Sequence, residues 1–325
     1  MVINWPTDAI ILHIPHASTV LPSEVKFLLG QEALAYEVDA MTDHHTDQLF
    51  DLPGARRCVF PVSRLVVDPE RFIDDPMECF GMGVVYTHAA NGEALRAISE
   101  IDRLGFINTY YHPHHARLTS MVDYCLEQNG RCLIIDCHSF PAQPLPYEKD
   151  HHRPDICIGT DPFHTDQALI RTMVETFETL GYAVAVNSPF SGTIVPLKHY
   201  HKDQRVASVM IEVNRSLYAN PTDFSILKSV LTTVMNKASG LATDKHKSAT
   251  GEDQNDFSEF EEIIQLAFRE QANHPQGLNS SHTHGTLYPA GDPRNDVTLL
   301  KDEAPTDPVG GTSKPLRVGS RRNWI

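Results

Sequence analysis

The sequence predicts an α/β fold of three layers, in which helices flank both faces of a mostly parallel or mixed sheet. Three short apolar runs, at residues 9–14, 132–135 and 207–213, are typical of strands buried on both faces. Segments with a helical spacing of apolar residues stand between them, for example residues 167–180. Strands that alternate with helices in this way favour a doubly wound sheet.

The first half of the chain supplies two strands and two helices. Residues 9–14 form a strand, and the apolar pattern of 57–67 indicates a second strand that a proline interrupts. The spacing of apolar residues predicts a helix over 32–52 between them. A longer helix is predicted over 93–129, and Pro113 should break or kink it because proline removes a helical hydrogen bond.

The second half continues the alternation up to a closing helix. In this prediction polar residues stand at the carboxyl end of the central strand, after the apolar run 132–135. The later elements are strands over 153–160, 182–187 and 207–213, and helices over 167–180 and 225–237.

Composition divides the chain into three parts. Residues 1–237 are expected to form one α/β domain. Residues 238–274 read as a linker, in which 257–269 can form an amphipathic helix. Residues 275–325 are rich in Gly, Pro, Ser, Thr and Asn without apolar periodicity, so we expect a mostly disordered tail.

Charge and cysteine content exclude several classes of protein. A net charge of -15 argues against nucleic-acid and anionic-membrane partners, because no general positive field attracts them. No apolar run approaches the length of a membrane span. The 6 cysteines form no C-x-x-C pair, which favours reduced thiols and a cytoplasmic location. The oligomeric state is left open.

The end of the central strand carries the first candidate site. Asp136, His138 and Ser139 follow the apolar run, at the edge where open α/β sheets bind ligands. Residues two apart on a strand share a face, so Asp136 and His138 should be neighbours. Histidine is a common metal ligand, but a hydrogen-bonded core histidine explains the same residue, and both interpretations stay open.

Two other predicted strands bring further candidates. His16 directly follows the first strand, while His13 within it is either a second ligand or a hydrogen-bonded strand residue. Glu212 lies inside the apolar run 207–213, where burying an unpaired carboxylate is costly, so a functional role is favoured.

Charged residues also mark the predicted helix 32–52 and the segment after it. Asp39 and Asp43 share a helix face. This face is interpreted either as a cation site or as a solvated acidic surface. Arg64 and Arg71 have guanidinium groups that can bind carboxylates in two-point geometry, although arginine pairs are also common on protein surfaces.

Taken together, these stretches resemble the N-formylglutamate amidohydrolase family, whose wider relatives include the aspartoacylase and zinc carboxypeptidase groups. The resemblance covers about residues 9–220 and implies a zinc-dependent hydrolase with a phosphorylase/hydrolase-like α/β fold related to that of zinc carboxypeptidases. The motifs that carry it, in order, are Ile14-Pro-His16-Ala-Ser, Thr42-Asp43-x-His45, Ser63-Arg-Leu-Val-Val-Asp-Pro-Glu-Arg71, Asp136-Cys-His-Ser139, Asn187-Ser-Pro-Phe and Ile211-Glu-Val-Asn-Arg-Ser-Leu-Tyr218.

The resemblance implies a role for each matching residue. His16 and His138 correspond to histidine ligands of Zn²⁺, although another divalent metal could replace it. Glu212 corresponds to the carboxylate that takes the proton of the attacking water. The expected substrate is a small anionic N-acyl amino acid such as N-formylglutamate, whose deformylation belongs to histidine degradation. Its carboxylates would be bound by Arg64, Arg71 and Arg215.

The chain departs from the family pattern at two places. The wider families have a glutamate ligand three residues after the first histidine, where this chain has Thr19. Asp43 is therefore the candidate for the third ligand, with Asp39 and Glu37 as alternatives. Many members have Asp-Leu-Asn-Arg where this chain has Asp68-Pro-Glu-Arg71, which leaves the exact substrate open.

Three residues have a less defined place in this scheme. Asp136 could orient a metal ligand from behind, and His115 and Asn187 could contact the substrate or a ligand. One alternative function is hydrolysis of a different N-acyl amino acid or small peptide, which a substrate panel would separate. Another is a metal-binding or regulatory module without catalysis, in which Glu212→Gln would change nothing.

Overall fold

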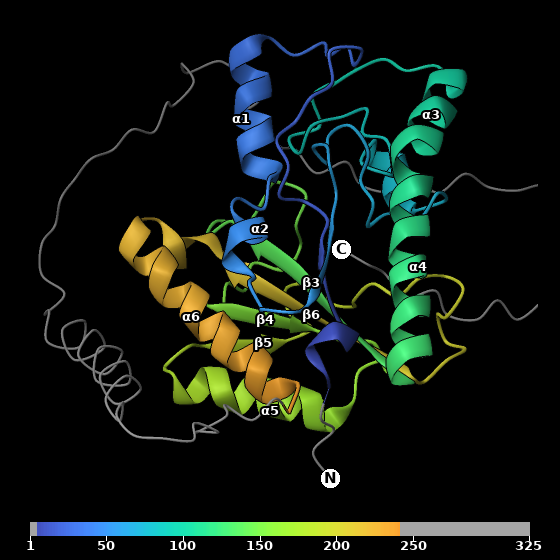
Figure 1. The fold of residues 1–325 in the computed structure, drawn as a ribbon. Coiled ribbons are helices and arrows are strands. Elements are labelled where there is room, and N and C mark those ends of the chain that lie inside the picture. Colours follow the sequence, from blue (N-terminus) through green and yellow to red (C-terminus); the bar gives the residue numbers. More distant parts are fainter. Residues whose placement is uncertain (1–4, 241–325) are drawn as a thin grey trace, which may run out of the picture. The chain divides into compact units, whose positions relative to one another are not determined.

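A six-stranded sheet lies at the centre of the computed structural model, which describes residues 5–240 (Figure 1). The strand order is β2-β1-β3-β6-β4-β5. All neighbouring strands are parallel except β4 and β6, which pair antiparallel. The predicted α/β fold with a mostly parallel or mixed sheet is therefore confirmed. The strands are β1 (Ile10–Ile14), β2 (Arg56–Val59), β3 (Cys132–Phe140), β4 (Ile156–Gly159), β5 (Val184–Val186) and β6 (Val206–Asn214).

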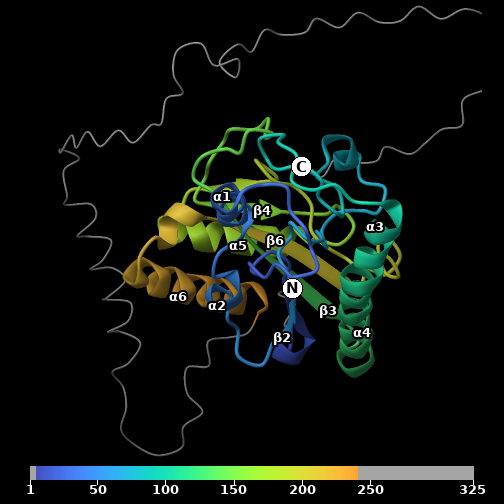
Figure 2. The ribbon, with the colours of Figure 1, turned by 90° about the horizontal axis from the view of Figure 1, so that it is seen from above.

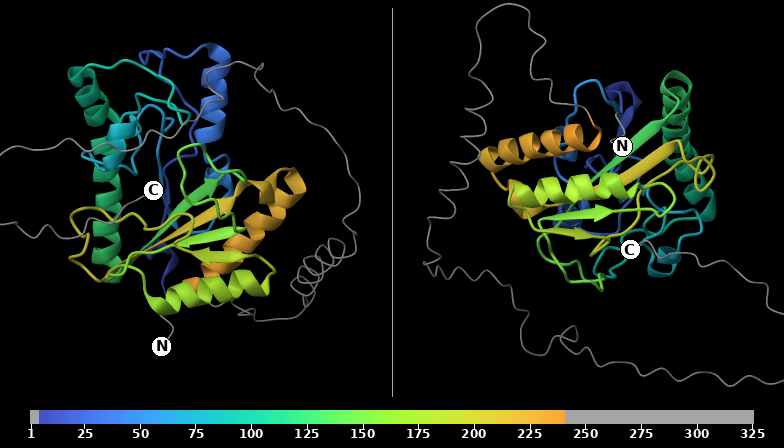
Figure 3. Two further views of the ribbon diagram at one scale, coloured as in Figure 1. Left: turned by 180° about the vertical axis from the view of Figure 1, so that it is seen from behind. Right: turned by 90° about the horizontal axis from the view of Figure 1, so that it is seen from below.

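Helices cover both faces of the sheet and make three layers (Figure 2). The helices α5 and α6 pack side by side on one face, where Leu133 and Ile211 are buried (Figure 3). The helix α4 lies on the opposite face, against Ile11 and Ile134. Neighbouring positions on one strand thus point to different apolar layers, which explains the continuous apolar runs. The helices are α1 (Gln31–Met41), α2 (Thr46–Leu49), α3 (Glu100–Phe106), α4 (His112–Asn129), α5 (Gln167–Thr179) and α6 (Pro221–Ala238).

The central strand β3 is longer than its apolar run. It continues through Asp136 and His138 to Phe140, and all of its residues are buried. The polar residues after the apolar run belong to the strand, because their side chains find partners on neighbouring strands and the backbone ladder with β6 persists.

The helix predicted over 32–52 is two helices, α1 and α2. The hydroxyl group of Thr42 donates to a carbonyl oxygen of α1 at 2.6 Å and closes that helix. His45 adopts a left-handed backbone, with φ of 61°, before α2 begins. In the break between the helices, the backbone N–H of Asp43 donates to the carbonyl oxygen of His16 at 3.0 Å. The break therefore places Asp43 next to the end of β1.

The helix predicted over 93–129 begins at residue 100, where the side chain of Ser99 accepts the backbone N–H of Asp102. A wider, π-helical turn, Ile107–Tyr111, joins α3 to α4. Pro113 lies in the first turn of α4, where the missing N–H of proline is tolerated. The helical path therefore continues across the proline, and the irregular turn precedes it.

The strand predicted over 57–67 is only β2, which ends at Val59 ahead of the proline. The elements predicted after residue 150 match β4, α5, β5, β6 and α6 to within a few residues. All cysteines are free thiols. No helix among residues 5–240 is long and apolar enough to cross a bilayer. The predicted helix at 257–269 and the predicted tail lie outside the described residues, and the domain boundary at 237 and the cytoplasmic location stay predictions.

Candidate active site

Four polar side chains lie on one face of the sheet, in the second half of its central strands. The strand register pairs His13 of β1 with Asp136 of β3, and His138 of β3 with Glu212 of β6. Paired residues on neighbouring parallel strands point to the same face, and so do residues two apart on one strand. The register therefore forms a histidine–carboxylate cluster from these four residues, near the carboxyl ends of the central strands.

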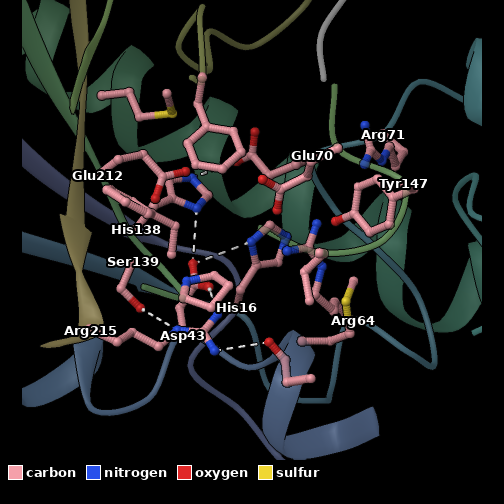
Figure 4. Close-up of a pocket in the computed structure, with 18 of the residues that line it drawn as sticks. His16, Asp43, Arg64, Glu70, Arg71, His138, Ser139, Tyr147, Glu212 and Arg215 are labelled. Atoms are coloured by element: carbon pink, nitrogen blue, oxygen red, sulfur yellow. Dashed lines mark hydrogen bonds and ion pairs between the residues drawn. The ribbon is translucent and has the colours of Figure 1, made fainter. Parts of the chain in front are cut away.

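His16 and Asp43 complete this cluster from two loops. The nearest approach joins Nδ1 of His138 to Oδ2 of Asp43, at 3.1 Å, and Nδ1 of His16 lies 3.6 Å from the same oxygen (Figure 4). One donor atom from each of the three side chains lies within 4.8 Å of the other two. The structure thus brings together the three residues predicted as metal ligands, and their role stays a prediction.

The donor set fits a divalent metal ion. Nδ1 of His16 is buried and has no hydrogen-bond partner in the part of the chain that the structure describes, although it faces the Asp43 carboxylate. The other ring nitrogens are held by carboxylates: Nε2 of His16 contacts Asp68 at 2.8 Å, and Nε2 of His138 contacts Asp136 at 3.1 Å. Metal-binding histidines characteristically donate their second N–H to such a partner, which fixes the ring and leaves the other nitrogen free.

The spacing of these donor atoms agrees with that interpretation. Around a tetrahedral zinc ion with bonds of about 2.0–2.2 Å, neighbouring ligand atoms are roughly 3.3 Å apart. Burial opposes ionisation of Asp43, but the hydrogen bond with His138 and the nearby imidazole of His16 hold the pKa of Asp43 well below its usual range. Asp43 is therefore ionised at neutral pH, as a carboxylate ligand must be.

Asp68 is the shared hydrogen-bond partner of His16 and of two neighbouring side chains. It is fully buried and accepts hydrogen bonds from Arg64 at 2.7 Å and from the hydroxyl group of Tyr86 at 2.8 Å. Burial would raise the pKa of Asp68, but Arg64 and His16 lower it well below its usual range. The ionised carboxylate therefore holds both the imidazole of His16 and a cavity-lining arginine.

Asp136 has the corresponding place behind His138. One oxygen, Oδ1, contacts both His138 Nε2 and His13 Nδ1, the latter at 2.8 Å, and the other accepts the backbone N–H of Ile194 at 3.1 Å. Burial would lower the pKa of His13, but Asp136 and Glu70 raise it to about 9. The contact with His138 agrees with the expectation that Asp136 orients this ring.

Glu212 is a carboxylate buried on β6. Its side chain lies beside His138 on the neighbouring strand, and its Oε2 atom has no hydrogen-bond partner among the described residues. Burial raises the pKa of Glu212 to about 8, and the nearby His138 offsets part of that effect. A carboxylate that holds a proton near neutral pH is suited to general acid–base chemistry.

A cavity opens above the cluster and contains all three predicted arginines. Arg64 is occupied by Asp68, and Arg215 donates to the hydroxyl group of Ser139 at 3.3 Å while also lying near Asp43. Nε of Arg71 is buried and lacks a hydrogen-bond partner, so it is the cation most available to a ligand. The cavity is lined by His16, Ala40, Met41, Asp43, Arg64, Glu70, Arg71, His138, Ser139, Phe140, Pro141, Leu145, Tyr147, Glu148, Phe190, Ser191, Met210, Glu212 and Arg215.

The remaining predicted residues lie away from this cavity. The carboxylate of Asp39 is exposed and pairs with His44, and Glu37 accepts the backbone N–H of Ala90, so neither joins the cluster. His115 contacts the carbonyl oxygen of Pro69 at 2.9 Å and lines a second cavity. The amide of Asn187 is bonded to Thr160, and Asn187 does not line the cavity, although the loop that follows it does.

Sequence reasoning assigned no role to several residues of this site. Asp68 directly follows the apolar run Leu65–Val67, the same signal that selected Asp136, and could have been found in that way. Tyr86 and Tyr147 lie in segments without an apolar period, so no pattern marks them. The pairing of His13 with Glu70 depends on how a loop folds over β1, which local sequence does not reveal.

Comparison with known proteins places the chain in a family. The model of the N-formylglutamate amidohydrolase family matches residues 8–219, a range that includes every residue of the cavity. A search of curated protein sequences found no match.

Two solved structures share the fold. The N-formylglutamate amidohydrolase from Ralstonia eutropha JMP134 superposes with a TM-score of 0.61 at 21% identity, covering 73% of this chain and 94% of that one. The gene product Atu2144 from Agrobacterium tumefaciens superposes with a TM-score of 0.56 at 20% identity, covering 71% of this chain and 92% of that one. The relation to zinc carboxypeptidases stays a prediction. Because the family model matches more than half of its residues, this chain belongs to the N-formylglutamate amidohydrolase family.

Proposed function

We propose that this protein is a zinc-dependent amidohydrolase that cleaves the N-formyl amide of N-formylglutamate and releases formate and glutamate. The observation that supports this most strongly is one cavity lined by His16, Asp43 and His138 and by Glu212, whose Oε2 atom has no hydrogen-bond partner among the described residues. The name of the family, and that of the Ralstonia protein, point to the substrate.

His16, Asp43 and His138 would hold the metal, and imidazole with carboxylate is a donor set that suits Zn²⁺. When bound, the ion supplies a Lewis acid that polarises the amide carbonyl and makes water more acidic. Three protein ligands are typical of catalytic zinc sites, because the fourth position is kept for water or substrate. Structural zinc sites have four protein ligands. Asp68 and Asp136 keep the two rings in the orientation that binding requires.

Glu212 would move the proton. As water attacks the formyl carbonyl carbon, Glu212 accepts the proton of that water and then delivers it to the departing amine nitrogen. A base that must both take and return a proton works best with a pKa near the working pH. In the metal-free protein, burial raises the pKa of Glu212 to about 8, and a bound cation nearby would lower it toward the working pH.

The arginines would bind the two carboxylates of the substrate. Arg71 is the first candidate, because its buried Nε lacks a hydrogen-bond partner while the carboxylate of Asp68 lies 3.8 Å away. The hydrogen bonds of Arg64 and Arg215 to protein groups keep their guanidinium groups fixed at the cavity wall. This arrangement favours small anionic N-acyl amino acids over neutral ones.

Formate release from N-formylglutamate by the zinc-loaded protein tests the proposal. We expect faster turnover of N-formylglutamate than of N-acetylglutamate, N-formylleucine or a dipeptide. Faster hydrolysis of one of the other compounds would contradict the substrate and retain the reaction class. If the zinc-loaded protein hydrolyses none of them, the chain is a metal-binding module and the enzymatic proposal is wrong.

A further inference from the structure

A second group of metal-ligating side chains lies on the other side of the His138 ring from Asp43. It consists of His13, Glu70 and Asp136, whose donor atoms all lie within 4.8 Å of one another. Nδ1 of His13 is 2.8 Å from Asp136 Oδ1 and 3.2 Å from Glu70 Oε1. These separations are close to the roughly 3.3 Å between neighbouring ligand atoms of tetrahedral zinc, as are those among His16, Asp43 and His138.

The trio concentrates negative charge that needs a cation. Two carboxylates approach the same ring nitrogen, and one N–H can donate well to only one of them. Oε1 of Glu70 is buried and, apart from its 3.2 Å contact with His13, has no hydrogen-bond partner among residues 5–240. Among the described residues, the ion-pair partners of Glu70 and Asp136 are histidines, never lysine or arginine. Either a second proton on His13 or a metal ion must therefore supply the positive charge.

The surroundings of the trio are those of a metal site. Nε2 of His13 lies 2.8 Å from Nε2 of His114, so His13 can donate this N–H and turn the lone pair of Nδ1 toward the carboxylates. The other oxygen of Asp136, Oδ2, accepts a hydrogen bond from the backbone N–H of Ile194, which fixes the carboxylate. Each of the two ligands on the sheet is thus oriented by a partner behind it.

Glu70 is the member of the trio nearest to solvent. Glu70 lines the active-site cavity and a second cavity, whose walls include Pro69, Phe72, Tyr111 and His115. The side chain of Glu70 is 17% exposed, whereas His13 beneath it is fully buried. An ion can therefore reach the trio past Glu70, and water can fill the remaining coordination position.

We propose that His13, Glu70 and Asp136 form a second divalent-cation site, adjacent to the site of His16, Asp43 and His138. One imidazole and two carboxylates suit Zn²⁺ or Mn²⁺. Asp136 links the two sites, because its Oδ1 atom contacts His138 as well as His13. The second site binds its ion whether or not N-formylglutamate is the substrate.

Metal counting on the full chain tests the second site. Protein stripped with a chelator is saturated with Zn²⁺ or, separately, with Mn²⁺, desalted, and analysed for metal per chain. We expect two ions of at least one metal in the parent protein and one in Glu70→Gln. This substitution keeps the size of the side chain but replaces the charged carboxylate with a neutral amide. Calorimetric titration of the same proteins should show two classes of binding in the parent and one in the variant.

Asp123→Asn is the matched control, because Asp123 is a surface carboxylate that also contacts a histidine, His199, at 2.8 Å. It should keep both ions, which separates the trio from adventitious surface binding. A parent protein that binds one ion at saturation with Zn²⁺ and also one at saturation with Mn²⁺ overturns the second site, whatever the variant does. So does a Glu70→Gln protein that keeps two. Formate release measured on the same samples reports separately on the reaction.

Discussion

Replacing Glu212 with glutamine tests the proposed general base with little change of shape. The side chain is 8% exposed and Oε2 has no hydrogen-bond partner, so the amide loses no contact at that atom. Removal of a positioned general base lowers kcat by about 10²–10⁴-fold. We expect formate release from N-formylglutamate to fall within that range, while zinc bound per chain at the first site stays unchanged.

The same substitution has a signature in the metal-free protein. Burial raises the pKa of Glu212 from 4.5 to about 8, so between these values the folded state holds a proton that the unfolded state releases. The contribution of this group to the free energy of unfolding is therefore greatest below pH 4.5 and decreases as the pH rises toward about 8. The decrease is at most about 1.4 kcal/mol per pH unit, and Glu212→Gln should remove it.

Steady-state kinetics with formate detection and urea unfolding at several pH values measure both effects. Glu175→Gln is the matched control, because Glu175 is exposed on α5 and lines neither of the two cavities described above. It should retain the parent kcat and the parent pH dependence of stability. A Glu212→Gln protein that hydrolyses N-formylglutamate at the parent rate would refute the assignment of the base.

Three further changes have defined outcomes. Asp68→Asn leaves buried cationic groups without their carboxylate, so urea unfolding should show a loss of about 3–5 kcal/mol and chelator competition a zinc affinity about 10–100-fold weaker. Unchanged affinity would show that Asp68 does not position His16. Arg71→Gln should raise KM for N-formylglutamate more than it lowers kcat, and an unchanged KM would contradict substrate binding by Arg71. Removing metal with a chelator should lower the Tm in a thermal melt, because only the folded state offers the assembled site; an unchanged Tm would contradict a bound ion.

The sequence predicted the strands well where an apolar run is continuous, as in β1 and β6, because burial on both faces leaves a signal within a few residues. It predicted less where one element breaks. The helical spacing of apolar residues continues through Thr42 and His45, so the end of α1 and the left-handed turn that position Asp43 could not be foreseen.

Several residues of the candidate site could be selected one by one from the sequence, but their assembly could not be predicted. His138 and Glu212 each stood out as a polar group at or within an apolar run. Their pairing across β3 and β6 depends on strand order and register, which are set by the packing of the whole sheet. The same holds for His13 and Glu70, whose contact requires the loop after β2 to fold back over β1.

Anomalous diffraction at the zinc absorption edge, from crystals of the zinc-loaded protein, tests the first metal site most directly. We expect a peak about 2.0–2.1 Å from Nδ1 of both His16 and His138, and about 2.0–2.2 Å from a carboxylate oxygen of Asp43. A zinc-loaded crystal with no peak among these three side chains, or with zinc bound through Nε2 of either ring, would contradict the site on which the proposed reaction depends.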